Sequence, residues 1–433
     1  AGPMGRMSRR VIVLGFGLAV AALPALAVQV EPLAWTPGPN SAQPSLTATR
    51  EGSLALTWQQ KRGTDAELHV ARFDAPRRAN ANPSEASSIP SAQAIVARGD
   101  DWFVNWADFP SLAVLDNGDW VTFTLRKSAG STYAYDIHLQ RSLDGGATWQ
   151  PPVKVNDDGQ PVQHGFVSLL PDGGDRVLMV WLDGRQDTAH GAHGGPAGGH
   201  GADHHGHDEG PMTLRSAVVG RDGVAREGAK LDADTCSCCQ TDLVRRGGEA
   251  IAVYRDHAEG IRDIALLRRS SDGQWSAPTT VHDDAWRMPG CPVNGPAAAV
   301  NRDALAVLWP TMATGPLEVK LAISPRAGAA FAAPAVLEAG ESVLGRVDVA
   351  PWRDGGFLAS WVGGDGRGAV LRVAELDASG RVIARRDVVA LPPGRQLGHP
   401  RLAATGGDVA MVAWTEPTVQ GPRVRAAWLR AQD

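Results

Sequence analysis

The sequence has little cysteine, little tyrosine and no excess of basic charge. Four of its 433 residues are cysteine and three are tyrosine, charged residues make up 21%, and the formal net charge is −5. A chain without a basic excess lacks the electrostatic footprint of a nucleic-acid-binding protein. A chain of this length can also build a large core and does not need disulfides for its stability. We therefore expect no nucleic-acid partner, and the four cysteines need another explanation.

Beyond its first 27 residues the chain has no apolar run long enough to span a bilayer. At the start, three arginines precede the apolar segment VIVLGFGLAVAALPALA, which ends in the small residues at 25–27. This order of charge, apolar segment and small-residue site is typical of a secretory signal peptide. Pro24 and the short span argue against a membrane anchor. We predict a signal peptide at 1–27 and a periplasmic or secreted product, residues 28–433, without a membrane span.

The chain also lacks a helical period, and one strand pattern recurs along it. A short strand, a turn rich in Gly, Asp or Asn, and an apolar strand with an aromatic near its end form each unit, as in PSLTATREGSLALTW. Two further strands follow each unit, so the pattern predicts an all-β chain. Most units are spaced by 52 to 58 residues. The recurring aromatic positions are Trp58, Phe123, Trp181, Tyr254, Trp309, Trp361 and Trp414.

Repeats of about fifty residues with four strands each are typical of β-propeller blades. We predict a single propeller domain over 28–433 with seven blades, six being the alternative count. The seventh unit offers three strands, and the segment VQVEPLAW after the signal peptide is a spare strand that can complete it. We therefore expect an N-terminal strand to close the ring.

One motif carries a family resemblance. SLDGGATW, from Ser142 to Trp149, matches the Asp box S-x-D-x-G-x-T-W, and SSDGQW at 270–275 is a degenerate copy. With the blade repeats, it resembles the sialidase-like (bacterial neuraminidase repeat) propeller superfamily over nearly the whole mature chain. The segments CSCCQTD and GCPVNGP look like those of an exported subgroup. The Asp box is a folding device, because its Asp caps a tight Gly-rich turn between the third and fourth strands.

Propeller topology decides which residues share a face of the ring. Strands alternate in direction, so the link entering each blade lies on the same face as the loop between its second and third strands. Cys236, Cys238 and Cys239 fall in the link entering the fourth unit, and Cys291 in the link entering the fifth. The other candidates on this face, as substrate contacts or supports, are Asp108, Asp183, Arg185, Thr241, Arg255, Asp256, Asn294 and His399.

Several of these residues have a structural alternative. Asp183 with Arg185, and Arg255 with Asp256, fit ion pairs that fix loops. A histidine at a strand entry, such as His164 or His399, also fits a hydrogen-bonded structural residue.

A Gly-rich, His-rich insertion belongs to the same face. Residues 188–210 cannot build a core and read as a metal-attracting tract between the second and third strands of the third blade. Its histidines are His190, His193, His200, His204, His205 and His207.

The cysteines leave three interpretations open. Exported proteins form disulfides, and a bond from Cys291 to Cys238 or Cys239 would tie two blades. Adjacent cysteines are poorly placed for two ordinary bridges. The second interpretation is a transition-metal site made of the four cysteines and His164, since thiolates select Cu(I), zinc or iron–sulfur centres. The C-x-C-C spacing departs from that of zinc sites. A thiolate-rich exported site beside a His-rich loop favours copper over zinc. The third is a redox-active thiol pair. We predict a metal-binding propeller for metal handling or metal-dependent redox chemistry.

The resemblance supplies the alternative function, a glycoside hydrolase acting on sialylated or related acidic glycans bound at the propeller mouth. It implies three arginines on the sugar carboxylate, a Tyr nucleophile supported by Glu, and an Asp acid/base. The chain departs from that pattern, because it lacks the early F/Y-R-I-P motif. Arg185, Arg255 and Arg346 remain as a candidate clamp for the anion.

Overall fold

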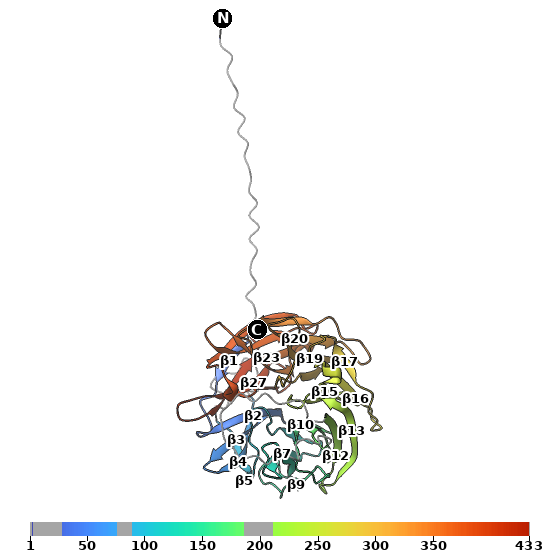
Figure 1. Cartoon of the computed structure of the whole chain (residues 1–433). Helices are drawn as coiled ribbons and strands as arrows, with labels where there is room; N and C mark the ends of the chain where they lie inside the picture. Colours follow the sequence, from blue (N-terminus) through green and yellow to red (C-terminus); the bar gives the residue numbers. More distant parts are fainter. Residues whose placement is uncertain (1, 3–27, 76–88, 186–210, 433) are drawn as a thin grey trace.

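A computed structural model describes residues 2, 28–75, 89–185 and 211–432. The predicted signal peptide and His-rich insertion therefore lie outside the described residues, apart from Gly2. The described chain forms seven antiparallel sheets of four strands each (Figure 1). The prediction of a seven-bladed propeller is confirmed. No helix among these residues has the length and hydrophobicity needed to cross a membrane.

The strands follow one another through the blades in chain order. Blades 1 to 3 contain β2 (Ser41–Ala48), β3 (Leu54–Arg62), β4 (Asp65–Phe73), β5 (Ala92–Gly99); β6 (Leu112–Val114), β7 (Trp120–Lys127), β8 (Tyr135–Ser142), β9 (Val153–Lys154); and β10 (His164–Pro171), β11 (Val177–Asp183), β12 (Met212–Val219), β13 (Ala225–Thr235). Blades 4 and 5 contain β14 (Asp242–Arg246), β15 (Glu249–Arg255), β16 (Ile264–Arg269), β17 (Thr279–His282); and β18 (Ala297–Asn301), β19 (Ala304–Thr311), β20 (Leu317–Ser324), β21 (Ala335–Gly340). Blades 6 and 7 contain β22 (Gly345–Pro351), β23 (Phe357–Gly364), β24 (Ala369–Leu376), β25 (Val382–Leu391); and β26 (Arg401–Ala404), β27 (Val409–Glu416), β28 (Arg423–Arg430) with β1 (Gln29–Pro32).

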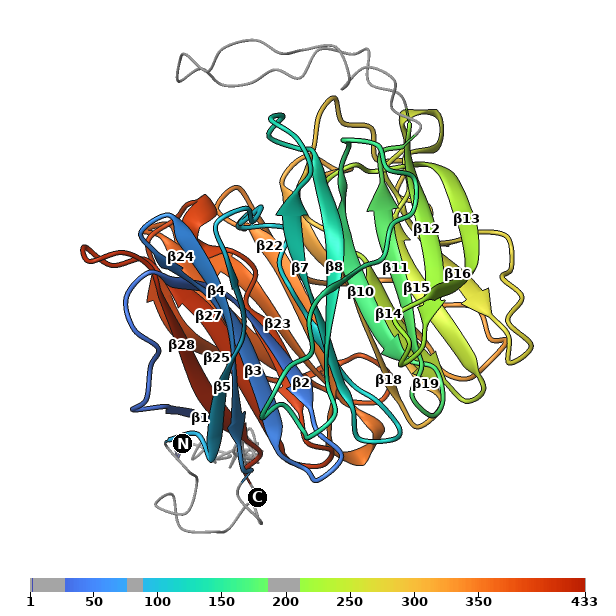
Figure 2. The same ribbon diagram turned by 90° about the horizontal axis from the view of Figure 1, so that it is seen from below.

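The N-terminal strand closes the ring, as predicted. Strand β1 pairs antiparallel with β28, with Gln29 opposite Arg430 and Pro32 opposite Ala427, so it becomes the outer strand of blade 7 (Figure 2). The first strand of each blade contacts the first strand of the next, and β2 contacts β26, so these strands surround the central channel. Strand β1 thereby completes the seventh sheet, and the ring closes between blades 7 and 1.

The recurring aromatics lie in the second strand of each blade and pack between sheets. All seven are buried, from fully buried Phe123 and Trp361 to Trp414 at 5% exposure. Trp58, for example, packs in one apolar cluster with residues of blades 1 and 7. Buried aromatics of this size contribute strongly to a core because each removes a large apolar area from water. The aromatic positions that recur in the sequence are therefore the positions that pack between neighbouring blades.

The Asp box joins the third and fourth strands of blade 2, as predicted. Asp144 accepts hydrogen bonds from the backbone nitrogen and the hydroxyl of Thr148 at 2.9 and 2.6 Å, and Trp149 Nε1 donates to Gly146 O at 3.1 Å. These contacts lower the pKa of Asp144 to about 2, with the hydroxyl bond the first cause. Gly146 has φ +91°, and a Cβ there would lie 2.7 Å from the ring of Trp120. The turn thus requires glycine.

Three aspartates, two of them buried, tie neighbouring blades around the channel. Asp108 accepts from Phe166 N at 2.8 Å. In the same way, carboxylates in blades 4 and 6 accept from the inner strand of the following blade: Asp242 from Ala298 N at 2.8 Å and Asp348 from Leu402 N at 2.7 Å. These contacts hold the inner ends of the blades in register, and with them the loops that carry the site.

Candidate metal centre

Two loops bring the four cysteines together at the entries of blades 4 and 5. Cys236, Cys238 and Cys239 lie between β13 and β14, and Cys291 lies between β17 and β18. Cys238 and Cys291 form a disulfide with 6.1 Å between their Cα atoms. The structure therefore brings Cys291 to the triplet, as the topology predicted. We call these four residues the sulfur cluster.

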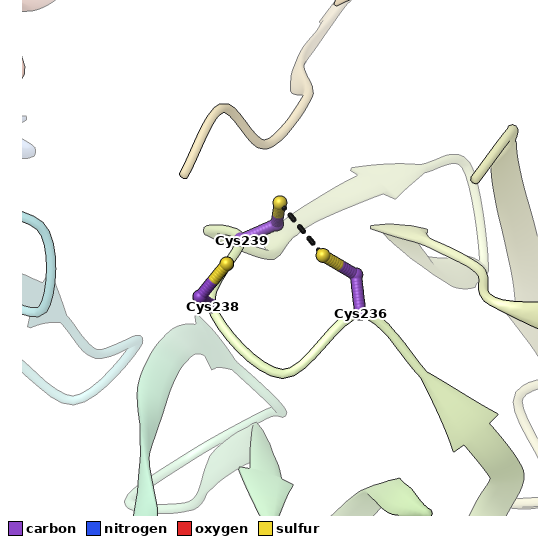
Figure 3. Close-up of side chains that lie close together, drawn as sticks. All are labelled: Cys236, Cys238 and Cys239. Atoms are coloured by element: carbon purple, nitrogen blue, oxygen red, sulfur yellow. Dashed lines mark hydrogen bonds between the residues drawn. The ribbon is translucent and has the colours of Figure 1, made fainter. Parts of the chain in front are cut away.

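Cys236 and Cys239 remain free thiols. Their sulfur atoms lie 3.0 Å apart and share a hydrogen bond, and the Sγ atoms of Cys236, Cys238 and Cys239 all lie within 4.8 Å of one another (Figure 3). Figure 3 shows the sulfur atoms of Cys236 and Cys238 turned inward around the bend of the chain, toward that of Cys239. A cluster of this kind can hold a metal ion.

Burial divides the sulfur cluster into an inner and an outer pair. Cys236 and Cys239 are 1% and 2% exposed, whereas Cys238 and Cys291 are half-buried. The free thiols are thus the buried pair, and the disulfide is the pair that solvent reaches.

Contacts between the two loops fix the cluster without relying on the disulfide. Gln240 accepts from Gly295 N at 3.0 Å and donates to Ala107 O at 2.7 Å. A Cβ at Gly295 would lie 2.1 Å from the carbonyl oxygen of Gln240, so only glycine permits this approach. Asn294 donates to Leu344 O at 3.1 Å and accepts from Arg346 N at 2.9 Å, which ties the second loop to blade 6.

Two arginines beside the sulfur cluster carry positive charge without an acidic partner. Arg255 is 2% exposed and donates only to carbonyls, including Asn294 O at 2.9 Å and Pro310 O at 2.7 Å. Arg262, 8% exposed, donates to Met288 O at 3.1 Å. Among the described residues neither guanidinium pairs with a carboxylate, and Arg255 does not bind the adjacent Asp256. Buried charge needs compensation, so this environment favours an anionic cluster.

The two free thiols have opposite pKa shifts. Burial acts against ionisation of Cys236, but the hydrogen bond with Cys239 and the charges of Arg262 and Arg255 outweigh it and lower its pKa to about 6. Burial, together with the bond to Cys236, raises the pKa of Cys239. These shifts favour the thiolate at Cys236 and the thiol at Cys239, and thiolate is the form that binds metal.

His164 groups with acidic residues, not with the cysteines. Its Nδ1 lies 3.0 Å from Tyr135 O, and its Nε2 lies 3.1 Å from Asp158 and 3.9 Å from Asp183. Asp158, His164 and Asp183 make a second group of metal-ligating types. Arg185 donates twice to Asp183, at 2.8 and 2.9 Å. We call these four residues the ion cluster, in which Arg185 already supplies the cation.

The ion cluster is charged and interlocked. Burial opposes the charged form of His164, but the bond to Asp158 and the nearby Asp183 outweigh it and raise the His164 pKa. The pKa of Asp158 falls well below its usual range, because its bond to His164 outweighs the effect of burial. Gln163 Nε2 donates to Ser237 O at 2.9 Å, which joins this cluster to the cysteine loop. Asp158 and Gln163 carried no sequence signal, since both lie outside the repeat pattern.

The remaining predicted residues lie on the same side of the ring in structural roles. Asp108 and Thr241 line a cavity of about 130 Å³ between the inner strands, with Asp242 and Arg401. Burial raises the pKa of Asp108 to about 7 and that of Asp242 to about 6. Asp256 accepts from His257 N at 2.7 Å, which fixes the turn after β15.

His399 is 4% exposed and stacks on Trp106, with ring centroids 5.9 Å apart. Burial, with the charges of Arg346 and Arg401, lowers its pKa well below the ordinary value. It is therefore a buried, stacked histidine at the mouth, but its Nε2 has no hydrogen-bond partner among the described residues, so the expected hydrogen-bonded structural role is not seen.

The groups that a sialidase-like mechanism implies are already engaged. Arg346 donates to Gly398 O and Gly394 O, both at 3.0 Å, while Arg255 binds carbonyls and Arg185 binds Asp183. Tyr135, 1% exposed, donates to Asp108 at 2.8 Å, and burial raises its pKa well above the usual value. A phenol shifted in that direction is a poor nucleophile. The described residues thus assemble no free anion clamp.

Comparisons with known proteins support the fold. No protein-family model matches the chain, and no curated protein matches it. A protein of unknown function from Dyadobacter fermentans aligns with a TM-score of 0.52 and 11% identity, covering 95% of this chain and 100% of that one. An α-L-arabinanase from Penicillium chrysogenum gives 0.47 and 11%, covering 93% and 97%. A leech intramolecular trans-sialidase gives 0.46 and 9%, covering 94% and 91%. At 11% identity, the likeness to the Dyadobacter fermentans protein speaks for a shared architecture alone.

Proposed function

We propose that this protein is an exported propeller that binds a transition metal, Cu(I), through its sulfur cluster, for metal handling or metal-dependent redox chemistry. The observation that carries the proposal is the buried pair of free thiols, Cys236 and Cys239, with sulfur atoms 3.0 Å apart. Export to the periplasm or the medium follows from the signal-like residues 1–27 and belongs to the same proposal.

The number of free sulfur ligands favours copper over zinc. With Cys238 and Cys291 bonded to each other, two thiols remain. Structural zinc sites take four ligands in a tetrahedron. Cu(I) is a softer ion that is satisfied by a few thiolates. To admit an ion, the sulfur atoms of Cys236 and Cys239 must move apart from their hydrogen-bonded distance, and both lie on a loop whose flanks are held by other contacts.

Charge also fits this assignment. Two thiolates and one Cu(I) leave a net negative charge in a buried place. Arg255 and Arg262 lie beside it with no carboxylate partner among the described residues, and they offset that charge. Zinc with the same two thiolates would be neutral and would leave both guanidinium groups without a counter-ion.

The direct test is metal content. The protein purified anaerobically after growth with copper should carry near-stoichiometric copper, and Cys239→Ser should lose it. Ser237→Ala is the matched control, because it changes the same loop, keeps all four sulfurs and should retain the metal. Copper that persists in Cys239→Ser, or wild-type protein that carries none after Cu(I) loading, would overturn the proposal.

A further inference from the structure

The sulfur cluster consists of two pairs with different access to solvent. The Cys238–Cys291 disulfide is half-buried, the thiols of Cys236 and Cys239 are buried, and Cys238 Sγ lies within 4.8 Å of both. We propose that the Cys238–Cys291 bond is a redox gate that sets the number of metal ligands at this site. Closed, it leaves two thiols; opened by an external dithiol, it yields four. The gate rests on the proposed function, because it acts on the same site.

A gate must open without dispersing the ligands, and the loops meet that condition. The side chain of Gln240 holds Gly295 N, and Arg255 donates to Asn294 O from two nitrogens at 3.1 and 2.9 Å. On the other loop, Gln163 holds Ser237 O. These contacts fix both cysteine loops independently of the disulfide. A bond that was only a staple would be redundant here, whereas a reversible bond changes the chemistry without moving the backbone.

The opening step is an ordinary thiol–disulfide exchange. One thiolate of the external dithiol attacks Cys238 or Cys291, the bond between these two breaks, and a mixed disulfide forms. The second thiol of the reductant then displaces the protein sulfur. Two electrons pass from the reductant to the protein, the reductant leaves as a disulfide, and Cys238 and Cys291 become thiols. The half-buried position of the bond gives the reductant access, while the inner pair is shielded from it.

The open state offers a different set of ligands. Four sulfurs about 2.3 Å from one ion, as in tetrahedral zinc sites, lie roughly 3.8 Å from one another. The three Sγ atoms of Cys236, Cys238 and Cys239 already lie within 4.8 Å of one another, so small side-chain rotations suffice. A divalent ion on four thiolates carries two negative charges, which Arg255 and Arg262 offset. The closed gate therefore suits Cu(I), and the open gate also accepts Zn²⁺ or Co²⁺.

The test compares the full chain before and after reduction. Protein isolated in air should show two thiols by thiol titration in denaturant, and four after treatment with dithiothreitol and anaerobic desalting. Co²⁺ is the probe of ligand number, because tetrahedral thiolate coordination gives intense sulfur-to-cobalt charge-transfer bands. We expect the bands in the reduced protein and at least about a tenfold weaker signal in the oxidised one.

Two variants keep the result decisive. The double variant Cys238→Ser/Cys291→Ser fixes the site at two thiols, so it should bind Cu(I) and give no Co²⁺ bands in either state. Thr279→Ala, at an exposed position of β17 ahead of the second cysteine loop, should switch like the wild type. Four thiols before reduction, or equal Co²⁺ bands in both states, would overturn the gate. Cu(I) titrated into the same samples separates the two claims: loss of Cu(I) binding in every state refutes the proposed function, whereas Cu(I) binding with an unswitched Co²⁺ signal refutes the gate alone.

Discussion

Two clusters built from metal-ligating residue types lie side by side on one face of the ring, and they differ in how their charge is balanced. In the ion cluster, Asp158 and Asp183 already face His164 and Arg185, with Arg185 donating twice to Asp183. In the sulfur cluster the positive charges lack a partner, because the buried guanidinium groups of Arg255 and Arg262 lie beside the cysteines and pair with no carboxylate among the described residues. The comparison teaches that residue type alone does not mark a metal site. On our proposal, the missing countercharge marks it.

Asp108, beside the channel, shows a third way of balancing a buried charge. Asp108 is 1% exposed and has no cationic partner among the described residues. Burial raises its pKa to about 7, so a proton neutralises it over much of the acidic range. On this face of the ring, an arginine balances the charge of Asp183 and a proton neutralises Asp108. On our proposal, a metal ion balances the sulfur ligands.

The largest effect is expected from removing the cation of the ion cluster. Arg185→Ala leaves the buried carboxylate of Asp183 without its main partner, which should lower the free energy of unfolding by about 3–5 kcal/mol. Denaturant unfolding measures this loss. Mn²⁺, which carboxylates bind and thiolates do not favour, should restore part of the stability of Arg185→Ala and leave the wild type unchanged. Equal stabilisation of both proteins would mean that Arg185 does not occupy the cation position.

The fit between the two cysteine loops should come next. Gly295→Ala places a Cβ 2.1 Å from Gln240 O, so the second loop must shift. We expect a loss of about 1–3 kcal/mol, as for other overpacked sites. Non-reducing peptide mapping should also find less of the Cys238–Cys291 bond. Gly248→Ala, at a position with nothing within 4 Å, is the matched control and should do neither. If Gly295→Ala changes neither the free energy of unfolding nor the amount of the Cys238–Cys291 bond, the packing described between these loops is contradicted.

The charge beside the sulfur cluster can be tested on its own. Arg262→Gln removes one of the two compensating charges and should weaken Cu(I) binding by about tenfold, or about 1.4 kcal/mol. Arg262→Lys keeps the charge and should recover most of the affinity. Competition titration with a Cu(I) chelator measures both. If the glutamine and lysine variants weaken binding equally, the arginine acts through its shape and not its charge.

The smallest effect concerns the protonated acid of the channel. Because the folded-state pKa of Asp108 is raised from 3.8 to about 7, its stabilising contribution is complete below about pH 4 and is lost as the pH rises to about 7. Asp108→Asn keeps the bond accepted from Phe166 N, can donate its amide N–H to the hydroxyl oxygen of Tyr135, and removes this loss. Relative to the wild type, the variant should gain stability between about pH 4 and pH 7 in urea unfolding. Parallel curves for the two proteins would show that Asp108 does not carry this pH dependence.

Much of the fold could be predicted from the sequence because each propeller repeat has its signals within one short segment of the chain. The second-strand aromatics, the turn signals and the Asp box each recur within one blade, and the incomplete seventh unit indicated that β1 must complete it. Topology alone then placed Cys291 near the triplet. The repeat pattern is a consequence of packing between adjacent sheets, so the pattern also predicts which residues form the core.

The site was less accessible, for reasons that particular residues illustrate. The adjacent Cys238 and Cys239 are equivalent in sequence, and which of them bonds Cys291 depends on the direction of each side chain in the folded loop. His164 was grouped with the cysteines because the backbone puts it on the same face. A buried histidine, however, must satisfy both ring nitrogens, and Asp158 and Tyr135 O do so. Gln240 and Gly295 are distant in the sequence and come into contact only in the folded chain. Neither residue therefore carries a signal in the sequence pattern.

The most direct measurement is X-ray absorption at the copper edge on anaerobically loaded protein, for the wild type and for Cys236→Ser/Cys239→Ser. We expect Cu(I) with sulfur neighbours alone in the wild type and no stoichiometric copper in the variant. A first shell of nitrogen or oxygen, or an unchanged spectrum once both inner sulfurs are gone, would contradict the assignment of copper to the buried thiol pair.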